Sequence, residues 1–433
     1  MATSVQDMTR PGEPIDLFYY DGETSKKQAF PTTQNTKFVQ QFQNMNGGSS
    51  VFTIPPNAGI QDIVCEFRIA GQASVGLALP RAWGYALVKQ VSFRYGGSSQ
   101  FFLTGDQIFQ NALRTQTSTA SADQIANLGG QIVTSATGGV TGVTASSLSN
   151  DATAAIVLCL PHSIPSGVGK AHPFPTDLLT QQVQVTVELY PLASIFSVAA
   201  TGASNPYTLY ANGLSNAQFV VQQVALNNMG DALCRRVDMA VNAYAFPCEF
   251  VQQVQRIQTL TNPSTPISQS VVLTGFRSGE VKAIHLWLTN SAELAQIASG
   301  GTGVYDPFNW VLPLSVQMTY AGDIYARYDY GSSPLWNLIN GNKAPFVNLA
   351  NFAAGTPLTA AASASQWVEL PFAQTLVDED SHHTLVHGKP ITNGIVNLDI
   401  TPPYVAGATW VLNVSYIYNA TLLMSQGTCD YVF

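Results

Sequence analysis

Residues 83–113 read W-G-Y-A-L-V-K-Q-V-S-F-R-Y-G-G-S-S-Q-F-F-L-T-G-D-Q-I-F-Q-N-A-L, and the rest of the chain can be interpreted from this segment. Apolar residues alternate with polar ones on both sides of the Gly-Gly-Ser-Ser segment, a pattern that predicts two strands joined by a turn. Gly105 and Asp106 then open a segment with the spacing of a helix. The stretch therefore predicts a strand, a turn, a second strand and a short helix.

The same order of features returns in the second half of the chain. Residues 310–339 read W-V-L-P-L-S-V-Q-M-T-Y-A-G-D-I-Y-A-R-Y-D-Y-G-S-S-P-L-W-N-L-I. When Tyr95 is aligned with Tyr320, three further pairs coincide: Val91 with Val316, Phe93 with Met318, and Gly97 with Gly322. After one inserted residue Gly105 meets Gly331, where a second helix is expected. An element used once in each half indicates a duplicated module.

The composition is rich in apolar residues and poor in charge. A chain of 433 residues favours two or three domains. Its hydrophobic fraction is 46%, yet only 10% of its residues are charged, against about a quarter in average proteins. Ser, Thr, Asn, Gln and backbone groups must therefore satisfy the surface. This is typical of large β proteins and of subunits that bury much of their surface against neighbours.

The charge balance argues against one class of function. The formal net charge is −8 and no run of Lys or Arg occurs, whereas neutralising phosphates requires a basic face. We therefore expect no direct, sequence-specific nucleic-acid binding. The N-terminus M-A-T-S-V-Q-D-M-T-R-P-G has no apolar segment of the secretory type, so we expect no signal peptide. The five widely spaced cysteines favour a reducing compartment over a disulfide framework.

Short runs with period-two alternation recur along the chain. Residues 60–69 alternate between an apolar face and a wetter face, which carries Asp62, Val64, Glu66 and Arg68. Further strands are predicted at 50–55, 154–160, 182–190 and 218–226 in the first half, and at 269–274, 280–289, 366–372, 394–401 and 408–418 in the second. The later strands keep their order in both halves: 182–190 matches 394–401, and 218–226 matches 408–418.

These patterns predict an all-β protein of two tandem eight-stranded antiparallel jelly rolls, a double jelly roll, with short helices and long surface loops. Residues 1–45 are polar and turn-rich; they are assigned to an N-terminal arm, and a strand added to a neighbour fits them equally well. The first jelly roll is expected over 46–238 and the second over 239–433. The long loops are expected at 114–153, 191–216 and 341–365.

The tandem halves resemble those of a known family. Residues 77–97, L-A-L-P-R-A-W-G-Y-A-L-V-K-Q-V-S-F-R-Y-G-G, lead toward the short helix, and H-P-F-P-T-D-L-L follows at 172–179. Together with the length and the charge-poor composition, these segments resemble the double jelly-roll major capsid proteins of tailless icosahedral double-stranded DNA viruses. That lineage includes adenovirus hexon and the membrane-containing phages. The resemblance covers nearly the whole chain.

The resemblance implies a structural function. The chain is expected to be a major capsid protein that forms homotrimers of pseudo-hexagonal outline, which pack against neighbouring capsomers in an icosahedral shell. Penton and minor capsid proteins are implied as further partners, with a membrane beneath the shell as an additional candidate. The implied location is the virion capsid, after synthesis and assembly in the host cell. No cofactor is implied.

A viral spike or lectin-like, carbohydrate-binding β-sandwich is the alternative function. Such a protein stacks sugar rings on exposed aromatic side chains, for which the candidates are Phe93, Tyr95, Phe101 and Phe102. Alternate strand positions instead point some of these rings into a sandwich core, and we favour that interpretation. The alternative also gives no reason for the duplicated halves.

The densest polar cluster is Asp378-Glu379-Asp380-Ser381-His382-His383, with His387 four residues beyond His383. His382, His383 and His387 are weak candidates for metal ligands, because imidazole and carboxylate groups bind metal ions. A charged exposed loop explains the same run and is favoured, since the H-E-x-x-H template is absent. No metal site is therefore assigned.

Catalytic motifs are equally weak. Residues 166–170, S-G-V-G-K, lack the spacing and the following hydroxyl residue of a phosphate-binding loop. No G-x-S-x-G elbow occurs, and the acidic residues are too scattered to suggest a glycosidase pair. We therefore expect no catalytic residue and no enzyme. Asn413 and Asn419 begin formal glycosylation sequences inside a predicted strand, and we expect them to be unmodified.

Overall fold

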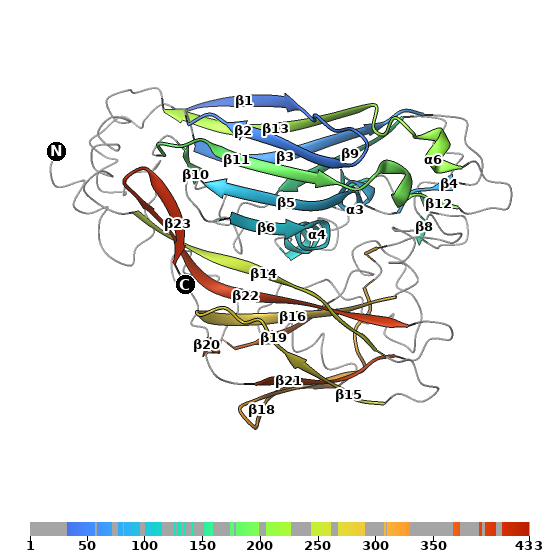
Figure 1. Ribbon diagram of the computed structural model, residues 1–433, viewed down its shortest axis with the longest axis vertical. Coiled ribbons are helices and arrows are strands. Elements are labelled where there is room, and N and C mark those ends of the chain that lie inside the picture. The colour runs from blue at the N-terminus through green and yellow to red at the C-terminus, as the bar shows by residue number, and fades with distance from the viewer. Residues whose placement is uncertain are drawn as a thin grey trace.

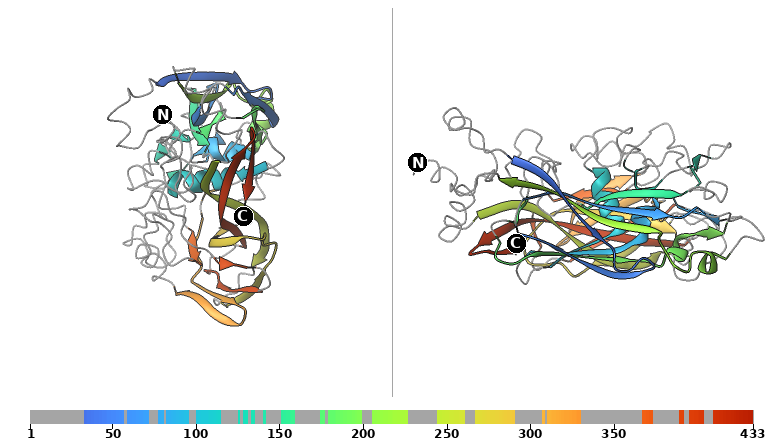
Figure 2. Two further views of the ribbon diagram at one scale, coloured as in Figure 1. Left: turned by 90° about the vertical axis from the view of Figure 1, so that its left-hand side faces the viewer. Right: turned by 90° about the horizontal axis from the view of Figure 1, so that it is seen from above.

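The structure is a computed structural model that describes two β-sandwiches placed one after the other along the long axis of the molecule (Figure 1). The strands of both sandwiches run across that axis (Figure 2). The structure describes residues 33–56, 59–71, 77–80, 82–95, 100–114, 125, 128–130, 133–134, 140–141, 151–158, 174–176, 179–198, 205–226, 244–260, 267–290, 307–308, 310–329, 367–372, 389–391, 395–403 and 409–432.

The first sandwich consists of two antiparallel sheets. One has the order β1 (Thr33–Gln41), β13 (Asn216–Leu226), β3 (Gly59–Ile69), and β3 also pairs with β9 (Ala152–Leu158) and β10 (Phe174–Pro175). The other has the order β2 (Gly48–Ile54), β11 (Val183–Leu189), β5 (Val88–Tyr95), β6 (Gln100–Thr104). Alternate side chains along β2, β3, β5, β9 and β11 are buried between the sheets, and nearly all of them are apolar.

The second sandwich is built in the same way. One sheet has the order β14 (Tyr244–Leu260), β22 (Trp410–Ser425), β16 (Glu280–Asn290), β19 (Val368–Pro371), with β20 (Lys389–Pro390) on β16 and β23 (Thr428–Val432) on β22. The other has the order β15 (Gln269–Leu273), β21 (Val396–Thr401), β17 (Ser315–Tyr320), β18 (Asp323–Asp329).

The two sandwiches repeat one strand order. The first contributes β1, β2, β3, β5, β6, β9, β11 and β13, whose pairings match those of β14, β15, β16, β17, β18, β19, β21 and β22 in the second. The aligned sequence pairs occupy equivalent registers, since Phe93 lies opposite Val185 and Met318 lies opposite Leu398. The prediction of two tandem eight-stranded antiparallel jelly rolls is confirmed.

The repeated hairpin is present in both halves, and its turn lies within the described residues only in the second half. Ala321 and Gly322 have φ of 52° and 94° and join β17 to β18 as a two-residue turn of positive φ. Its counterpart at Gly97 lies outside the described residues, and so does the helix expected near Gly331. In the first half, the helix expected at Gly105 is confirmed as α4 (Gly105–Arg114).

The strand predicted to begin at Trp83 begins instead at Val88. Residues Trp83–Leu87 form a short helix, α3, and all five of its residues are buried. Ala82 enters the helix with φ of 49°, and the Gly84 amide donates to the Gly129 carbonyl at 2.7 Å. The Tyr85 and Ala86 amides donate to the Ala82 carbonyl at 2.9 and 3.3 Å, so local hydrogen bonds form a helical turn where the alternating pattern predicted a strand.

Two strands lie in segments that the sequence had assigned differently. β1 occupies part of the expected N-terminal arm and pairs along its whole length with β13, from Thr33 opposite Leu226 to Gln41 opposite Gln218. β14 begins at Tyr244, within the expected second jelly roll, where no strand was predicted before residue 269. Both are edge strands, where one side faces no neighbouring strand. Residues 227–243 lie outside the described residues, so the boundary between 238 and 239 stays a prediction.

Short elements complete the described chain. They are η4 (Leu192–Ile195), α6 (Pro206–Leu209), the pair β4 (Leu77–Ala78) with β12 (Ser197–Val198), and the pair β7 (Val133–Thr134) with β8 (Val140–Thr141). Within the described part of the chain, no helix has the length and apolar character needed to span a membrane.

Candidate assembly surface

The first sandwich covers one sheet of the second. Helix α4 lies between the two sandwiches (Figure 1), where Gln107 Nε2 donates to Ser415 Oγ on β22 at 3.2 Å. The ring of Phe109 on the same helix lies 4.5 Å from that of Phe308. As a result β16 is buried on both of its faces, from residue 281 to residue 289. In this contact the first sandwich packs on the outer face of one sheet of the second.

A row of polar side chains lies buried in this contact. Ser415 on β22 is opposite His285 on β16, and His285 is opposite Glu369 on β19. His285 Nε2 lies 3.1 Å from Glu369 Oε2. The three residue types are those of a hydrolytic triad, but each residue is at most 1% exposed, so a dissolved substrate does not reach them. The row instead joins three strands beneath α4.

The equivalent sheet of the first sandwich has an open outer face. On β3 the inward side chains, such as Ile63 and Cys65, are fully buried, whereas Glu66 and Arg68 on the outward side are exposed. On β16, the equivalent strand, both sides are buried. The two sheets therefore differ in whether another jelly roll covers them, as far as the described residues extend.

Four valines form a continuous row across this open face. Val39 on β1 is opposite Val220 on β13, Val220 is opposite Val64 on β3, and Val64 is opposite Val157 on β9. The Val39 side chain is 49% exposed, Val64 and Val157 are partly exposed, and Val220 is buried at 7%. Outward positions of a solvated antiparallel sheet are normally polar. We call the outward face of β1, β13, β3 and β9, with this valine row at its centre, the candidate assembly surface.

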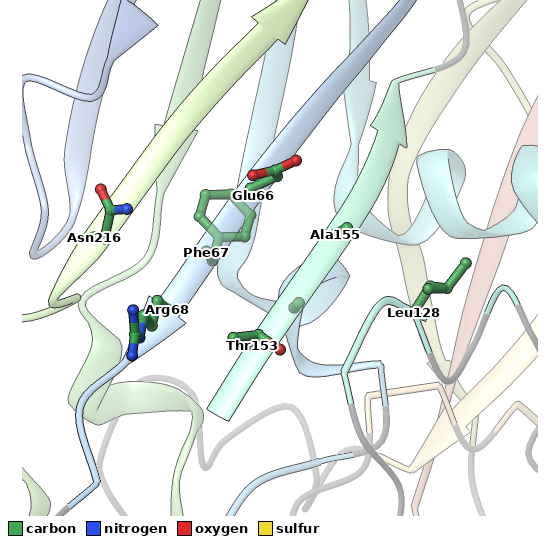
Figure 3. A pocket seen from close by; sticks show the side chains of 8 residues that line it. Glu66, Phe67, Arg68, Leu128, Thr153, Ala155 and Asn216 are labelled. Carbon is green, nitrogen blue, oxygen red and sulfur yellow. The ribbon is translucent and has the colours of Figure 1, made fainter. Parts of the chain in front are cut away.

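An open pocket lies next to the valine row (Figure 3). Its volume is about 460 Å³, and its lining residues are Glu66, Phe67, Arg68, Leu128, Thr153, Ala154, Ala155 and Asn216. Glu66 lies opposite Ala155 and Arg68 opposite Thr153, so the two charged residues continue the outward side of β3 beyond Val64. The pocket gives the candidate assembly surface a polar end beside its apolar centre.

The charged end of this pocket is tied to a neighbouring segment. Arg68 forms an ion pair with Asp151, whose Oδ1 also accepts a hydrogen bond from the Gly71 amide at 2.8 Å. The Gly71 amide and the Arg68 guanidinium hold the pKa of the Asp151 carboxyl below its usual range. Both side chains of the ion pair are largely solvated, so the pair orients Arg68 rather than stabilising the fold.

The residues considered for sugar stacking do not form a platform. Phe93, Tyr95 and Phe101 are at most 1% exposed and belong to the core, as the favoured interpretation predicted. Phe102 is 45% exposed on the outward side of β6. Its cross-strand neighbours on the same face of the sheet are, in order, Ser92, Thr186 and Val51. One exposed aromatic ring on a flat sheet face gives the carbohydrate-binding alternative no support.

Several other candidates from the sequence lie outside the described residues. These are the weak metal candidates His382, His383 and His387, and the glycine-containing segment 166–170. Among the residues that are described, no group of three or more His, Cys, Asp or Glu side chains is placed to hold a metal ion. The two glycosylation sequences are described: Asn413 is 6% exposed and Asn419 is 8% exposed, within strand β22.

Comparisons with known proteins identify the fold. No protein-family model matches the chain, and no curated protein matches its sequence. Among solved structures, the PBCV-1 virus capsid matches 94% of this chain and 98% of its own, with a TM-score of 0.64 and 12% identity. The Faustovirus major capsid protein matches 92% and 91%, with a TM-score of 0.56 and 10% identity. The mavirus major capsid protein matches 96% and 93%, with a TM-score of 0.53 and 9% identity.

These matches span both sandwiches, and at such low identity they establish a shared fold. The chain has the double jelly-roll fold of viral capsid proteins, as the sequence resemblance indicated. The candidate assembly surface itself was not identified from the sequence. The one available signal was Val64, an apolar residue at an outward position between Asp62 and Glu66, and its significance depends on neighbours that only the strand register supplies.

Proposed function

We propose that this chain is a major capsid protein that self-assembles into the shell of an icosahedral virus. The observation that carries the proposal is the presence of two equivalent eight-stranded sandwiches in one chain, in a fold shared with capsid proteins of similar length. The lectin-like alternative does not use the repeat, because one sandwich is enough to carry a sugar-binding site. A tiling subunit does use it, because each chain then supplies two similar blocks to a lattice.

The internal contact suggests how copies associate. Within the chain, the α4 side of the first sandwich seats on the outer face of the β14-β22-β16-β19 sheet. By the equivalence of the halves, the β18 side of the second sandwich fits the candidate assembly surface of another copy. Such a head-to-tail contact closes into a ring when its rotation is right. Three copies place six sandwiches in a ring, which supports the homotrimer of pseudo-hexagonal outline.

The surface chemistry supports burial of this face against a second copy. The valine row offers apolar area at the centre of the sheet, where an interface gains most from excluding water. On the side expected to meet it, Ile324 and Tyr325 of β18 are 63% and 38% exposed. With only 10% of residues charged, few charges lose water when the two faces meet.

The proposed function implies further partners and a location in the virion. Capsomers must contact neighbouring capsomers, and a closed icosahedral shell needs penton proteins at its fivefold corners and minor capsid proteins between its tiles. A membrane beneath the shell is an additional candidate partner, and the chain resides in the virion capsid. We propose no catalytic role. The division into an arm (1–45) and two domains (46–238 and 239–433) stays a prediction, and β1 (Thr33–Gln41) is the part of the arm that pairs with the first sandwich.

Negative-stain electron microscopy of the purified protein tests this proposal. We expect particles of threefold symmetry with a six-cornered outline, and arrays or shells of these particles at high protein concentration. Isolated two-lobed particles at every concentration would count against a capsid function. Binding to specific sugars on a glycan array by such two-lobed particles would instead favour the lectin-like alternative.

A further inference from the structure

A hairpin of the second sandwich reaches the first sandwich. Strands β22 and β23 pair from Thr421 opposite Val432 to Ser425 opposite Thr428, and they turn at Gln426 and Gly427. These two residues have φ of 50° and 78°, so the turn is the tight kind that favours glycine at its second position. This C-terminal hairpin extends beyond the second sandwich and lies beside the first (Figure 1).

The tip of the hairpin is bonded to the first sandwich. The Gly427 carbonyl accepts two hydrogen bonds from Thr180, one from its amide at 2.9 Å and one from its Oγ1 at 3.1 Å. The approach leaves no space for a side chain, because a Cβ at Gly427 would lie 2.3 Å from Thr180 Cγ2. The tip is therefore seated on Thr180 by its backbone.

One face of the hairpin packs against both sandwiches, whereas Thr428 and Val432 are exposed. Tyr431 on β23 packs 6.1 Å from Phe101 on β6 and 5.3 Å from Phe250 on β14, and Phe101 and Phe250 lie 5.2 Å apart edge to face. Leu422 and Met424 on β22 are fully buried. Three aromatic rings from three segments thus meet at the base of the hairpin.

We propose that this C-terminal hairpin is a clasp that fixes the angle between the two jelly rolls of one chain. Contacts at its tip and base lie on opposite ends of the hairpin, so together they resist rotation of one sandwich against the other. A head-to-tail ring closes only when each step turns by the right angle. On the proposed capsid function, the clasp therefore controls whether three copies close into a trimer.

A matched pair of variants tests the clasp. Gly427→Ala introduces a methyl group against Thr180. Gly322→Ala makes the same change in the turn between β17 and β18, where nothing lies within 4 Å of the added Cβ. Both glycines have positive φ, so both variants carry the same kind of backbone strain. Any effect confined to Gly427→Ala comes from the contact with Thr180.

Hydrogen exchange followed by mass spectrometry gives the readout, since the Thr180 amide is itself a donor in the contact. We expect exchange in the peptide containing Thr180 to be about tenfold faster in Gly427→Ala, because two hydrogen bonds are lost. Gly322→Ala should exchange at the wild-type rate there. Thr180→Gly combined with Gly427→Ala removes the clashing atoms and should restore protection in the neighbouring hairpin peptides.

The clasp proposal would be overturned if the Thr180 peptide were equally protected from exchange in the wild type and Gly427→Ala. It would also be overturned if both alanine variants lost the same amount of protection there. Particle masses of the same samples give the second readout: a broad distribution of oligomers is expected for Gly427→Ala, against a single species for wild type and Gly322→Ala. A single trimer species in Gly427→Ala would overturn the control of ring closure. A wild-type monomer would contradict the proposed capsid function, while the exchange comparison would still decide the clasp.

Discussion

Replacing Val64 by aspartate is expected to leave folded chains that no longer associate. Val64 points outward from β3 at the centre of the valine row, opposite Val220 and Val157. In an isolated chain Val64 is partly exposed, so the new carboxylate reaches water at a smaller cost than inside an interface. In the proposed trimer it would be buried without a partner, which costs about 3–5 kcal/mol and weakens each contact by about 100- to 4000-fold. Mass photometry at a fixed concentration measures the loss.

Val51→Asp is the matched control for this prediction. Val51 also points outward from the first sandwich, but from β2, on the opposite sheet, and its side chain is 45% exposed. The two variants therefore make the same chemical change on two faces of one sandwich. We expect Val51→Asp to keep the wild-type particle mass. Trimers of undiminished stability in Val64→Asp would mean that the open sheet face is not the contact between copies.

The second large effect is expected on stability, from Glu369→Ala. Glu369 and His285 are both buried, with 3.1 Å between His285 Nε2 and Glu369 Oε2. Removing the carboxylate leaves the imidazole in the contact between the sandwiches without its carboxylate neighbour. Breaking a buried pair of this kind lowers the free energy of unfolding by about 3–5 kcal/mol. Chemical denaturation followed by tryptophan fluorescence gives the value, since Trp367 and Trp287 lie in the same contact.

A surface pair supplies the control for this variant. Lys89 Nζ and Glu188 Oε1 lie 2.6 Å apart on the outward side of the first sandwich, with side chains 47% and 32% exposed. Exposed pairs contribute at most about 1 kcal/mol, so Glu188→Ala should be nearly neutral. If Glu369→Ala cost no more than Glu188→Ala, the buried row would have no part in holding the two sandwiches together.

The duplicated architecture was predictable from the sequence because it depends on local patterns. The hairpin of residues 88–104 and its copy at 315–329 each combine alternating apolar residues with turn residues, and both signals act within a few positions. The order of the later strands followed from the same alternation. The core positions Phe93 and Val316 were predictable for the same reason, since a strand with one wet face identifies its buried face.

The errors and omissions arise where long-range contacts decide the structure. Residues 33–41, T-Q-N-T-K-F-V-Q-Q, have a weak strand pattern, and β1 forms because β13 offers a complete partner edge. Residues 83–87 alternate like a strand but form a helical turn, in which the Gly84 amide donates to the distant Gly129 carbonyl. The candidate assembly surface requires four strands in register, so a single strand does not indicate it.

The particle mass of the purified wild-type protein in solution tests the central claim most directly. The chain has a mass of 46.3 kDa, so a homotrimer has a mass of about 139 kDa, three times that value. Mass photometry across a range of nanomolar concentrations should show this single species, and larger multiples of it should appear only at high protein concentration. A single species at the mass of one chain, unchanged on raising the concentration in multi-angle light scattering, would contradict the proposal that this double jelly roll builds a capsid.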